Sequence, residues 1–279
     1  MKIPAAIRRP RMAFTLVEAL VAISVFVLMM SLLSQMMGHA TNATHRTYQE
    51  VDSARGVRAS LDFLRADIEN MINVNGLTLL VRQDGANNTQ LVFLTQGRGP
   101  AAGEGGRCIA VAYTLLPTGE LDHRVASVSW SQIDLVTGAL SALSAPTAST
   151  LVTGCLRFEA MAVLDNGIAV PLTQAGGWRV ATLNGTALPS GFYGLVLSSG
   201  PVNAANPRVR SLLVGTAALD PQSYKLPRAS LIAGQLASPA SSGDLVETWN
   251  QNRKTVQAAG YPKPAVAALS FAEQVYPLK

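Results

Sequence analysis

The feature that most constrains this chain is an uncharged apolar run close to its N-terminus. No residue from Ala19 to Leu33 carries a charge, and the same composition continues to Met37. About 20 apolar residues are enough to cross the hydrocarbon core of a bilayer as a helix. One carboxylate, Glu18, stands at the start of the run, and at the bilayer centre it would cost about 3 kcal/mol. The sequence therefore predicts a membrane-spanning helix in which Glu18 has a function.

A short motif stands between the basic leader and the apolar run. The leader ends in a small residue, Ala13, and Phe14-Thr15-Leu16-Val17-Glu18 follows. This pattern resembles the N-terminus of type IV prepilins and of type II secretion pseudopilins. The resemblance implies cleavage by a prepilin peptidase between Ala13 and Phe14, N-methylation of Phe14, and a role for Glu18 in peptidase recognition and subunit assembly. The family usually has Gly where this chain has Ala13.

Two other targeting segments share part of this pattern. A cleaved secretory signal has a shorter apolar core, of about 7–15 residues, with its small residues after that core. In this chain the small residue Ala13 comes before the run. A plain signal anchor explains everything except Glu18, and it remains an alternative.

The formal net charge of +5 comes mostly from the leader. Lys2, Arg8, Arg9 and Arg11 precede the predicted cut, and without these four the 22 basic residues become 18 against 17 acidic ones. Cations that flank a span stay in the cytoplasm. We therefore expect a single-pass protein of the bacterial inner membrane with a cytoplasmic N-terminus. The C-terminal domain would be periplasmic or part of a surface filament. The remaining chain has no basic run, which disfavours nucleic acid as a partner.

The helical pattern continues beyond the apolar run. No proline occurs between Phe14 and Asn70. Apolar residues recur there at steps of three and four, at Val51, Ala54, Val57, Leu61, Leu64, Ile68 and Met71. This spacing predicts one long helix whose second half is amphipathic and packs on other elements.

After Gly76 the pattern changes to the alternation of strands. Strands are predicted over 77–82, 90–95, 108–116, 125–135, 151–164, 191–198 and 209–215. Asp165-Asn166-Gly167 predicts a two-residue hairpin, and Pro117-Thr118-Gly119 predicts a turn. Long antiparallel strands after one long helix indicate an α+β fold, which is also the architecture of pilins.

These elements divide the chain into five parts. The predicted parts are a cleaved cytoplasmic leader (1–13), a transmembrane half-helix (14–37), a periplasmic amphipathic half-helix (38–72), a β-rich domain (73–215) and a C-terminal extension (216–279). Within the extension, residues 244–258 predict a helix capped by Ser241 or Ser242, and residues 265–275 predict a final strand. Residues 137–150 are expected to form a loop.

The two cysteines, Cys108 and Cys155, both follow the predicted span. An oxidising envelope would allow them to pair, and the bond would close a loop of about 48 residues and contribute roughly 4 kcal/mol. The alternative is two buried thiols that behave as small hydrophobic groups. The spacing does not decide between these two readings.

The sequence contains no recognisable catalytic or metal-binding pattern. His39 and His45 are six residues apart, which is not the spacing that lets two imidazoles share a metal. No Gly-x-Ser-x-Gly elbow occurs, and the glycine-rich residues 97–106 lack the Gly-Lys-Ser/Thr ending of a phosphate loop. We therefore predict a protein without cofactor or metal and not an enzyme.

Looser similarities extend the resemblance to one branch of the family. The run from Leu61 to Ile68, the triplet Leu156-Arg157-Phe158, and Gly177-Trp178 before Leu188-Pro189 resemble segments of J-class minor pseudopilins and W-type minor pilins. The resemblance implies a low-copy subunit at the tip or in the initiation of a type II secretion pseudopilus or type IV pilus. Its partners would be prepilin peptidase and other pilin-like subunits, met through the N-terminal helix.

Two other functions remain as alternatives to this reading. A pilin-like module could capture a polymer, DNA or a surface, and its Gly- and Ser-rich loops would serve that purpose. A signal-anchored envelope enzyme is the other class. Neither alternative is favoured by a specific cluster of residues in the sequence.

Overall fold

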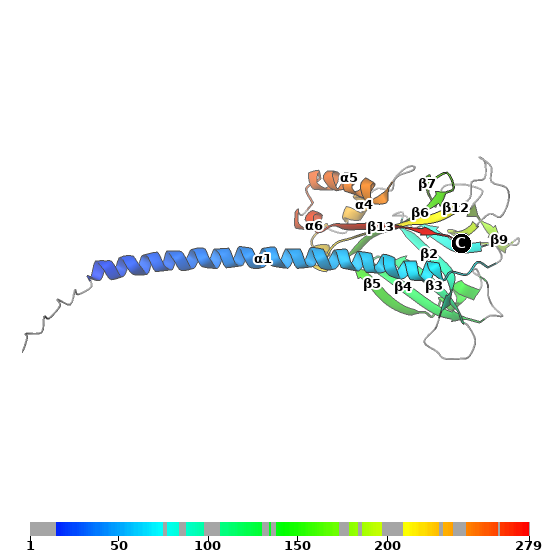
Figure 1. The fold of residues 1–279 in the computed structure, drawn as a ribbon, viewed down its shortest axis with the longest axis horizontal. Coiled ribbons are helices and arrows are strands. Elements are labelled where there is room, and N and C mark those ends of the chain that lie inside the picture. Colours follow the sequence, from blue (N-terminus) through cyan, green and yellow to red (C-terminus); the bar gives the residue numbers. More distant parts are fainter. Residues whose placement is uncertain are drawn as a thin grey trace, which may run out of the picture. The chain divides into compact units, whose positions relative to one another are not determined.

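The first element of the secondary structure is one helix of 54 residues, α1 (Leu16–Glu69). The computed structural model describes residues 15–74, 77–83, 88–97, 107–129, 134, 138–172, 179–183, 186–196, 209–228, 231–236, 244–261 and 263–278. The chain divides into two units, Met1–Tyr48 and Gln49–Lys279, so α1 contributes to both (Figure 1). We call them the N-terminal unit and the globular unit. The predicted single long helix is confirmed.

The larger sheet of the globular unit has seven strands in the order β5-β4-β3-β2-β1-β11-β8. All its neighbouring strands are antiparallel. The strands are β1 (Leu77–Gln83), β2 (Thr89–Gly97), β3 (Arg107–Leu115), β4 (Glu120–Val128), β5 (Thr147–Thr153), β8 (Arg179–Val180) and β11 (Phe192–Val196).

A second, four-stranded sheet has the order β13-β12-β6-β7 and is also antiparallel. Its strands are β6 (Cys155–Leu164), β7 (Ala169–Pro171), β12 (Val209–Ala218) and β13 (Ser270–Pro277). A separate short pair consists of β9 (Thr182–Leu183) and β10 (Thr186–Ala187).

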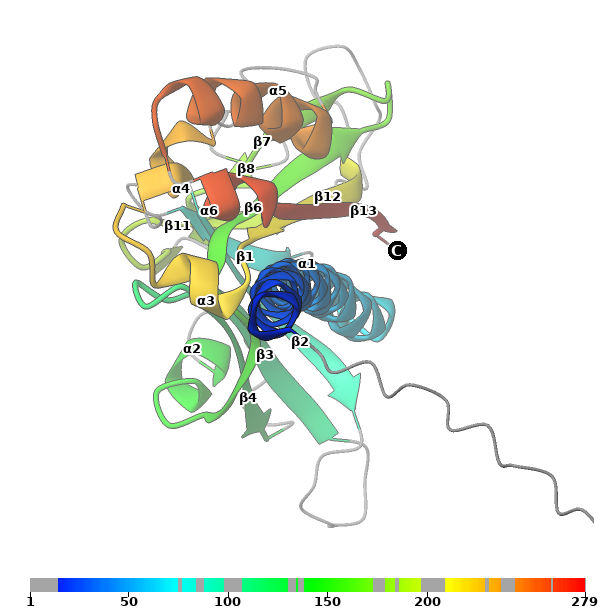
Figure 2. The same ribbon diagram turned by 90° about the vertical axis from the view of Figure 1, so that its left-hand side faces the viewer.

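Five short helices complete the described part of the globular unit, and four of them follow β12. They are α2 (Leu140–Ala142), α3 (Pro221–Tyr224), α4 (Ile232–Gln235), α5 (Leu245–Ala258) and α6 (Lys263–Ala267). Figures 1 and 2 show α4, α5 and α6 on the four-stranded sheet, and a cluster of buried apolar side chains around Trp249 lies between them and that sheet.

The central core lies between the second half of α1 and both sheets. Leu64 of α1 is fully buried there, together with Phe93 of the larger sheet and Phe158 of the smaller one. Side chains of a strand alternate between the two faces of a sheet. Accordingly Phe93 faces α1, whereas its neighbours Val92 and Leu94 belong to a separate cluster on the other face.

The structure differs from the strand predictions in three places. The predicted strand 125–135 agrees with the structure only over 125–128, because β4 starts at Glu120 directly after the turn at 117–119 and ends at Val128. The Glu120 carbonyl oxygen accepts from Leu116 N–H at 2.9 Å, and residues 130–133 and 135 lie outside the described residues. Residues 137–150 contain α2 and most of β5 instead of a loop. The predicted strand 151–164 is two strands that break at Gly154, which has a φ of +75°. A Cβ at Gly154 would collide with the carbonyl oxygen of Leu219, so only glycine fits there.

The hairpin between β6 and β7 is confirmed, but its loop is longer than predicted. Leu164 and Ile168 close the loop through a 3.0 Å bond from Leu164 N–H to the Ile168 carbonyl oxygen. Three residues, 165–167, therefore lie between them, and Gly167 takes a φ of +81°. A three-residue loop with a left-handed glycine at its end is a common hairpin geometry.

The segment after 215 completes the fold of the globular unit. All eight residues of β13 pair with β12, while the beginning of the predicted strand 265–275 belongs to α6. The predicted helix 244–258 is confirmed as α5, but its cap is Asp244, whose Oδ1 accepts from Glu247 N–H at 2.8 Å. Ser241 and Ser242 lie outside the described residues.

Candidate functional site

The described N-terminal unit begins with a capped helix. The backbone N–H of Glu18 donates to Oγ1 of Thr15 at 3.2 Å, and α1 starts at Leu16. Thr15 is thus the N-cap residue and Glu18 the third residue of the helix, which is the Thr-x-x-Glu order of a capping box. A carboxylate in the first turn also complements the positive end of the helix dipole. The signal is visible in the sequence as Thr15-Leu16-Val17-Glu18, although a capping box was not among the features predicted from it.

The predicted processing site lies just before this cap. Ala13 and Phe14 are outside the described residues. The helix begins two residues after the predicted cut. The capping interaction between Thr15 and Glu18 uses only atoms that cleavage before Phe14 would leave in the chain.

Beyond the cap, α1 presents an apolar surface on every side. Its 18-residue apolar window has a mean hydropathy of 2.5 and no buried residue, so α1 is long and apolar enough to span a membrane. The exposed large side chains of this part are Leu16, Val17, Leu20, Val21, Ile23, Val25, Phe26, Val27, Leu28, Met29, Met30, Leu32, Leu33, Met36 and Met37. An apolar surface of this extent marks a membrane or interaction site. We call residues 16–37 the apolar segment.

The apolar segment carries few polar groups. Ser24 Oγ donates to the Val21 carbonyl oxygen at 2.8 Å, which satisfies its hydroxyl within the helix. Such pairing is what a hydrocarbon environment demands of a polar side chain. Glu18 is the single ionisable residue between 16 and 37 and is exposed.

A polar stretch follows the apolar segment in α1. Thr41, Thr44 and Thr47 each donate to the carbonyl oxygen four residues earlier, at 2.8–3.1 Å. His39 and His45 are exposed in the same stretch. This part of the helix is therefore polar and exposed, in contrast to the apolar segment.

The second half of α1 is fixed to the globular unit by its apolar stripe. Of the seven predicted stripe residues, Val57, Leu61, Leu64 and Ile68 are buried. Val51 is 38% exposed, so the packed stripe begins later in the helix than predicted. The stripe also includes two buried serines, of which Ser60 donates to the Val57 carbonyl oxygen at 2.7 Å.

A polar cluster at the end of α1 adds a specific attachment to the sheet. Oδ2 of Asp67 accepts from the Tyr113 hydroxyl at 2.6 Å and lies 3.0 Å from Nε2 of His123. Burial, and then the Asp67 carboxylate, raise the pKa of Tyr113 far above its ordinary value. No local pattern in the sequence predicts this cluster, because its members are 46 and 56 residues from Asp67 and only the packing of α1 on β3 and β4 brings them together.

The cluster has the residue types of a hydrolase triad but a different geometry. Oγ of Ser149 lies 3.5 Å from Nδ1 of His123 and 3.4 Å from the His123 carbonyl oxygen. A distance of 3.5 Å is at the limit of hydrogen bonding, and the Asp67 carboxylate is shared with the Tyr113 hydroxyl. This geometry fits the attachment of α1 to three strands better than proton transfer to a serine.

A second attachment joins α1 to the smaller sheet. The buried Tyr276 of β13 donates its hydroxyl to the Leu61 carbonyl oxygen at 2.8 Å. Burial, and then the nearby Asp62, raise the pKa of Tyr276 well above its ordinary value. The strand β13 near the end of the chain is thus bound directly to α1.

The two cysteines do not form the disulfide that the sequence allowed. Cys108 and Cys155 are both buried free thiols. Cys155 belongs to the central core on the α1 side of the larger sheet, whereas Cys108 lies in the cluster on its other face. The sheet itself therefore separates them. Burial raises the pKa of Cys108 and raises that of Cys155 to about 12, so neither is an activated thiolate.

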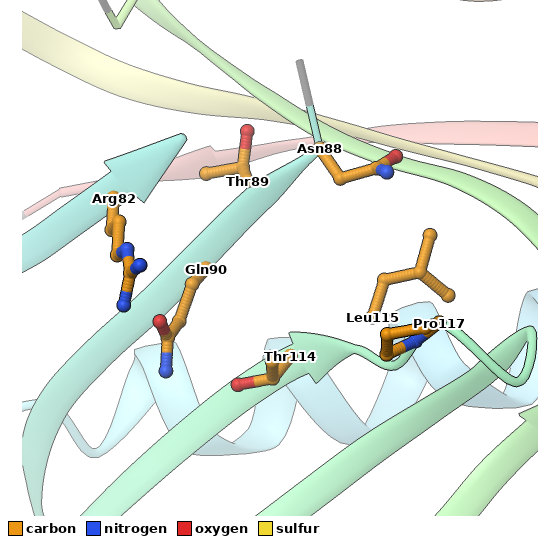
Figure 3. Close-up of a pocket in the computed structure, with 7 residues that line it drawn as sticks. All are labelled: Arg82, Asn88, Thr89, Gln90, Thr114, Leu115 and Pro117. Atoms are coloured by element: carbon orange, nitrogen blue, oxygen red, sulfur yellow. The ribbon is translucent and has the colours of Figure 1, made fainter. Parts of the chain in front are cut away.

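A small cavity of about 250 Å³ lies at the ends of β1, β2 and β3 (Figure 3). Its lining residues are Arg82, Asn88, Thr89, Gln90, Thr114, Leu115 and Pro117. Oδ1 of Asn88 accepts from Phe158 N–H at 3.3 Å, and Oγ1 of Thr89 accepts from Ala160 N–H at 3.0 Å. The side chains of Asn88 and Thr89 therefore join the larger sheet to β6 of the smaller one. The Cζ atom of Arg82 lies over the Phe192 ring, 5.7 Å from the ring centroid. The cavity thus lies where the two sheets meet.

Titratable groups elsewhere in the described part do not gather into a metal site. No group of three His, Cys, Asp or Glu that could hold a metal ion occurs among the described residues. The buried charges of Arg157 and Glu159 pair with each other at 2.8 Å on β6. The candidate site of this chain is therefore the exposed half of α1 with Glu18 at its start.

Comparison with known proteins finds similarity to solved structures. No protein-family model matches the chain, and no curated protein matches its sequence. Among solved structures, the chain is similar to a type IV-like pilin from Thermus thermophilus, with 13% identity and a TM-score of 0.41 over 81% of this chain and 95% of that one. The α+β fold class rests on the elements themselves, one long helix and two antiparallel sheets.

Proposed function

We propose that this chain is a structural, pilin-like subunit that assembles with related subunits through the apolar segment of α1. The observation that carries the proposal is the division of one helix into two surfaces. Residues 16–37 are apolar and exposed with a single carboxylate, while Val57, Leu61, Leu64 and Ile68 are buried in a β-rich unit. A lipid bilayer covers the first surface before assembly, and the helices of neighbouring subunits cover it afterwards.

The proposal includes processing by a prepilin peptidase. The cut falls between Ala13 and Phe14, and Phe14 becomes the N-methylated first residue. The cap formed by Thr15 supports this step, because the helix needs nothing upstream of Phe14 to start at Leu16. Removal of the leader leaves a cationic amine one helical turn away from Glu18.

Glu18 is assigned the pairing role in assembly. A carboxylate that enters a packed apolar bundle without a partner costs several kcal/mol. The terminal amine of a neighbouring subunit's first residue supplies an opposite charge at the matching depth. Correct register is then favoured by the pair, and wrong register is penalised by the unpaired charge.

The proposed location is the bacterial inner membrane, with the N-terminus in the cytoplasm and the globular unit outside it. Lys2, Arg8, Arg9 and Arg11 before the span support this orientation. The proposed system is a type II secretion pseudopilus or a type IV pilus. The globular unit, Gln49–Lys279, is bulky for a repeating shaft subunit. Its size supports a minor, J-like or W-like subunit at the tip or in initiation.

Mass spectrometry of the N-terminus of the protein from its native membrane tests the proposal. The expected result is a chain that begins with N-methylated Phe14. A chain that retains Met1, or one that starts after Met37, would contradict both the processing and the assembly role. As a control for the peptidase, a Phe14→Asp variant should keep its leader and still insert in the membrane.

A further inference from the structure

The cavity at the ends of β1, β2 and β3 is produced by the divergence of two neighbouring strands. The ladder between β2 and β3 runs from the pair Gly97–Arg107 to the pair Leu91–Tyr113 and ends there. Both strands continue beyond that point, where β2 pairs with β1 and β3 pairs with β4. The cavity of about 250 Å³ lies between the diverging ends (Figure 3).

Hydrogen bonds to other strands hold the two walls of the cavity apart. Oγ1 of Thr89 accepts from Ala160 N–H at 3.0 Å, which binds the start of β2 to β6. On the other wall, Leu116 N–H donates to the Glu120 carbonyl oxygen at 2.9 Å, which directs the end of β3 into its turn toward β4. Because each wall is fixed by bonds to a different strand, the cavity is built into the fold.

The charge of the cavity is one-sided. Its described lining contains the cation Arg82 and neither Asp nor Glu. Arg82 is exposed and takes part in none of the ion pairs found among the described residues. Its Cζ atom lies over the Phe192 ring, and stacking on an aromatic face orients a guanidinium while its N–H donors at the edge stay free to bind. The lining therefore favours an anion.

Gln90 lies directly beside this arginine. The register pairs Arg82 of β1 with Gln90 of β2, and the Cβ atoms of residues opposite each other are about 4.5–5.5 Å apart. Figure 3 shows the two side chains pointing the same way from their neighbouring strands. A guanidinium fork and an amide N–H₂ can together donate to both oxygens of one carboxylate.

Thr114 adds an unpaired hydroxyl to the wall. Its side chain lines the cavity, and its Oγ1 is buried without a hydrogen-bond partner in the part of the chain that the structure describes. Buried hydroxyls in folded proteins are nearly always paired, so an unpaired one calls for an explanation. Rotation about the Cα–Cβ bond turns this hydroxyl toward the cavity, where it becomes a third donor for a ligand.

We propose that the cavity binds a carboxylate that is carried on a short aliphatic body. Arg82, Gln90 and Thr114 donate to the carboxylate oxygens, and Leu115 and Pro117 contact the aliphatic part. One cation with neutral donors matches the single charge of a carboxylate better than the higher charge of a phosphate group. The C-terminal residue of a peptide and a short-chain organic acid both have this chemistry. The site uses the globular unit alone and does not depend on assembly through α1.

Ligand-observed NMR of the full chain in detergent tests the proposal, with N-acetyl-L-alanine and propionate as probes. Ligands of this size should bind at about millimolar concentration, and the neutral N-acetyl-L-alaninamide should not bind. Arg82→Gln should weaken binding by about tenfold or more, since it removes charged hydrogen bonds. Thr114→Val should weaken binding roughly fivefold. The melting temperature of this second variant should stay equal or rise, because the hydroxyl has no partner in the described chain.

Arg58→Gln is the matched control. Arg58 is an exposed arginine of α1, and α1 packs on the face of the larger sheet that carries Phe93. Arg82 follows Leu80 by two residues and therefore shares with it the opposite face. The R58Q variant has the same change of charge as R82Q and should bind both probes as the natural chain does.

Four results would overturn the proposal. Absence of binding of both probes, or equal binding of N-acetyl-L-alaninamide, would exclude a carboxylate site. Tighter binding of inorganic phosphate or glucuronate would refute the aliphatic carboxylate as the ligand. Unchanged affinity in R82Q and T114V, or an equal loss in R58Q, would place the binding outside the cavity. If the proposal holds, the probe that binds more tightly identifies the source, a peptide end for N-acetyl-L-alanine and a free acid for propionate.

Discussion

The two halves of α1 have the same backbone and opposite surroundings. Leu28 in the first half is 64% exposed, and Leu64 in the second half is fully buried. In the first half, apolar side chains occupy every face of the helix, while in the second they form one stripe beside exposed charges such as Arg58 and Asp62. A helix that is apolar all round needs a non-aqueous surrounding, and a striped helix needs a folded partner.

Because of this difference, the two halves of α1 determine different properties of the protein. The second half is held by the core and by contacts such as that of Asp67 with Tyr113, so its loss would unfold the globular unit. The apolar window of the first half has no buried residue, so its side chains determine where the chain resides and what it assembles with. Variants placed in matched pairs along α1 should therefore separate folding from assembly.

The largest expected effect is that of Leu64→Ala. Truncation of a fully buried leucine costs about 2–5 kcal/mol, which in a unit of this size lowers the melting temperature by roughly 5–15 °C. Leu28→Ala, with the same chemical change in the apolar segment, should leave the melting temperature of the globular unit unchanged. Thermal unfolding of both variants in detergent checks this prediction, and equal shifts would refute the division of α1.

A smaller loss is expected for Tyr113→Phe. The change removes the hydroxyl that donates to Asp67 at 2.6 Å, and a hydrogen bond to a charged group contributes about 1.5–3 kcal/mol. Asp67 keeps its contact with His123 and part of its exposure to water, so we expect a loss of about 1–2 kcal/mol. Tyr48→Phe is the control, because Tyr48 is 66% exposed. Urea unfolding curves of the two variants would contradict the attachment if their midpoints were the same.

Glu18→Ala should affect assembly and leave folding unchanged. Loss of the proposed pair with a neighbouring amine should lower incorporation into the filament by about tenfold, which corresponds to about 1.4 kcal/mol. Insertion in the membrane should persist, because alanine is compatible with the bilayer. The control is Glu50→Ala, an exposed carboxylate later in the same helix. Cross-linking to other pilin-like subunits in the native membrane measures incorporation, and a normal yield for Glu18→Ala would remove the assigned role.

The smallest expected effect is a dependence of the stability of the globular unit on pH, which arises from Glu273. Burial is the main cause that raises the pKa of Glu273 above its ordinary value of 4.5, and the carboxylate of Asp244 adds to it. A raised pKa means that Glu273 contributes its stability below that ordinary value and loses it as the pH rises through the raised one. Glu273→Gln should therefore be more stable than the natural chain at about pH 7.5, by less than about 1 kcal/mol since the group is partly exposed.

The difference between Glu273→Gln and the natural chain should vanish below about pH 4, where Glu273 is protonated in both folded and unfolded states. Glu50→Gln, on the exposed face of α1, should show no such pH dependence. Melting temperatures at the two pH values measure the effect. A variant that is less stable at the higher pH would show that the hydrogen bond from Val246 N–H to Glu273, of 3.0 Å, outweighs the burial of the charge.

Local patterns predicted the elements that have a strong period. The stripe from Val57 to Ile68 was correct, because a helix with one buried face repeats its apolar residues every three or four positions. The strand predicted over 125–135 overlaps β4 only over 125–128, because a half-exposed strand such as β4 has weak alternation and its start is fixed by the turn at 117–119. The sequence also did not predict the break between β5 and β6 at Gly154. That break depends on the close contact of Gly154 with the carbonyl oxygen of Leu219, which directly follows β12.

The sequence by itself determined that α1 has an exposed apolar half, a carboxylate at its start and a packed half, because helical period and hydropathy are local properties of the chain. Only the tertiary structure decided that Asp67 meets Tyr113 and His123 and that β13 returns to bind α1. It also decided that Cys108 and Cys155 lie on opposite faces of a sheet. These relations depend on which strands become neighbours, and that choice is made by the packing of the whole core, since many strand orders share the same local pattern.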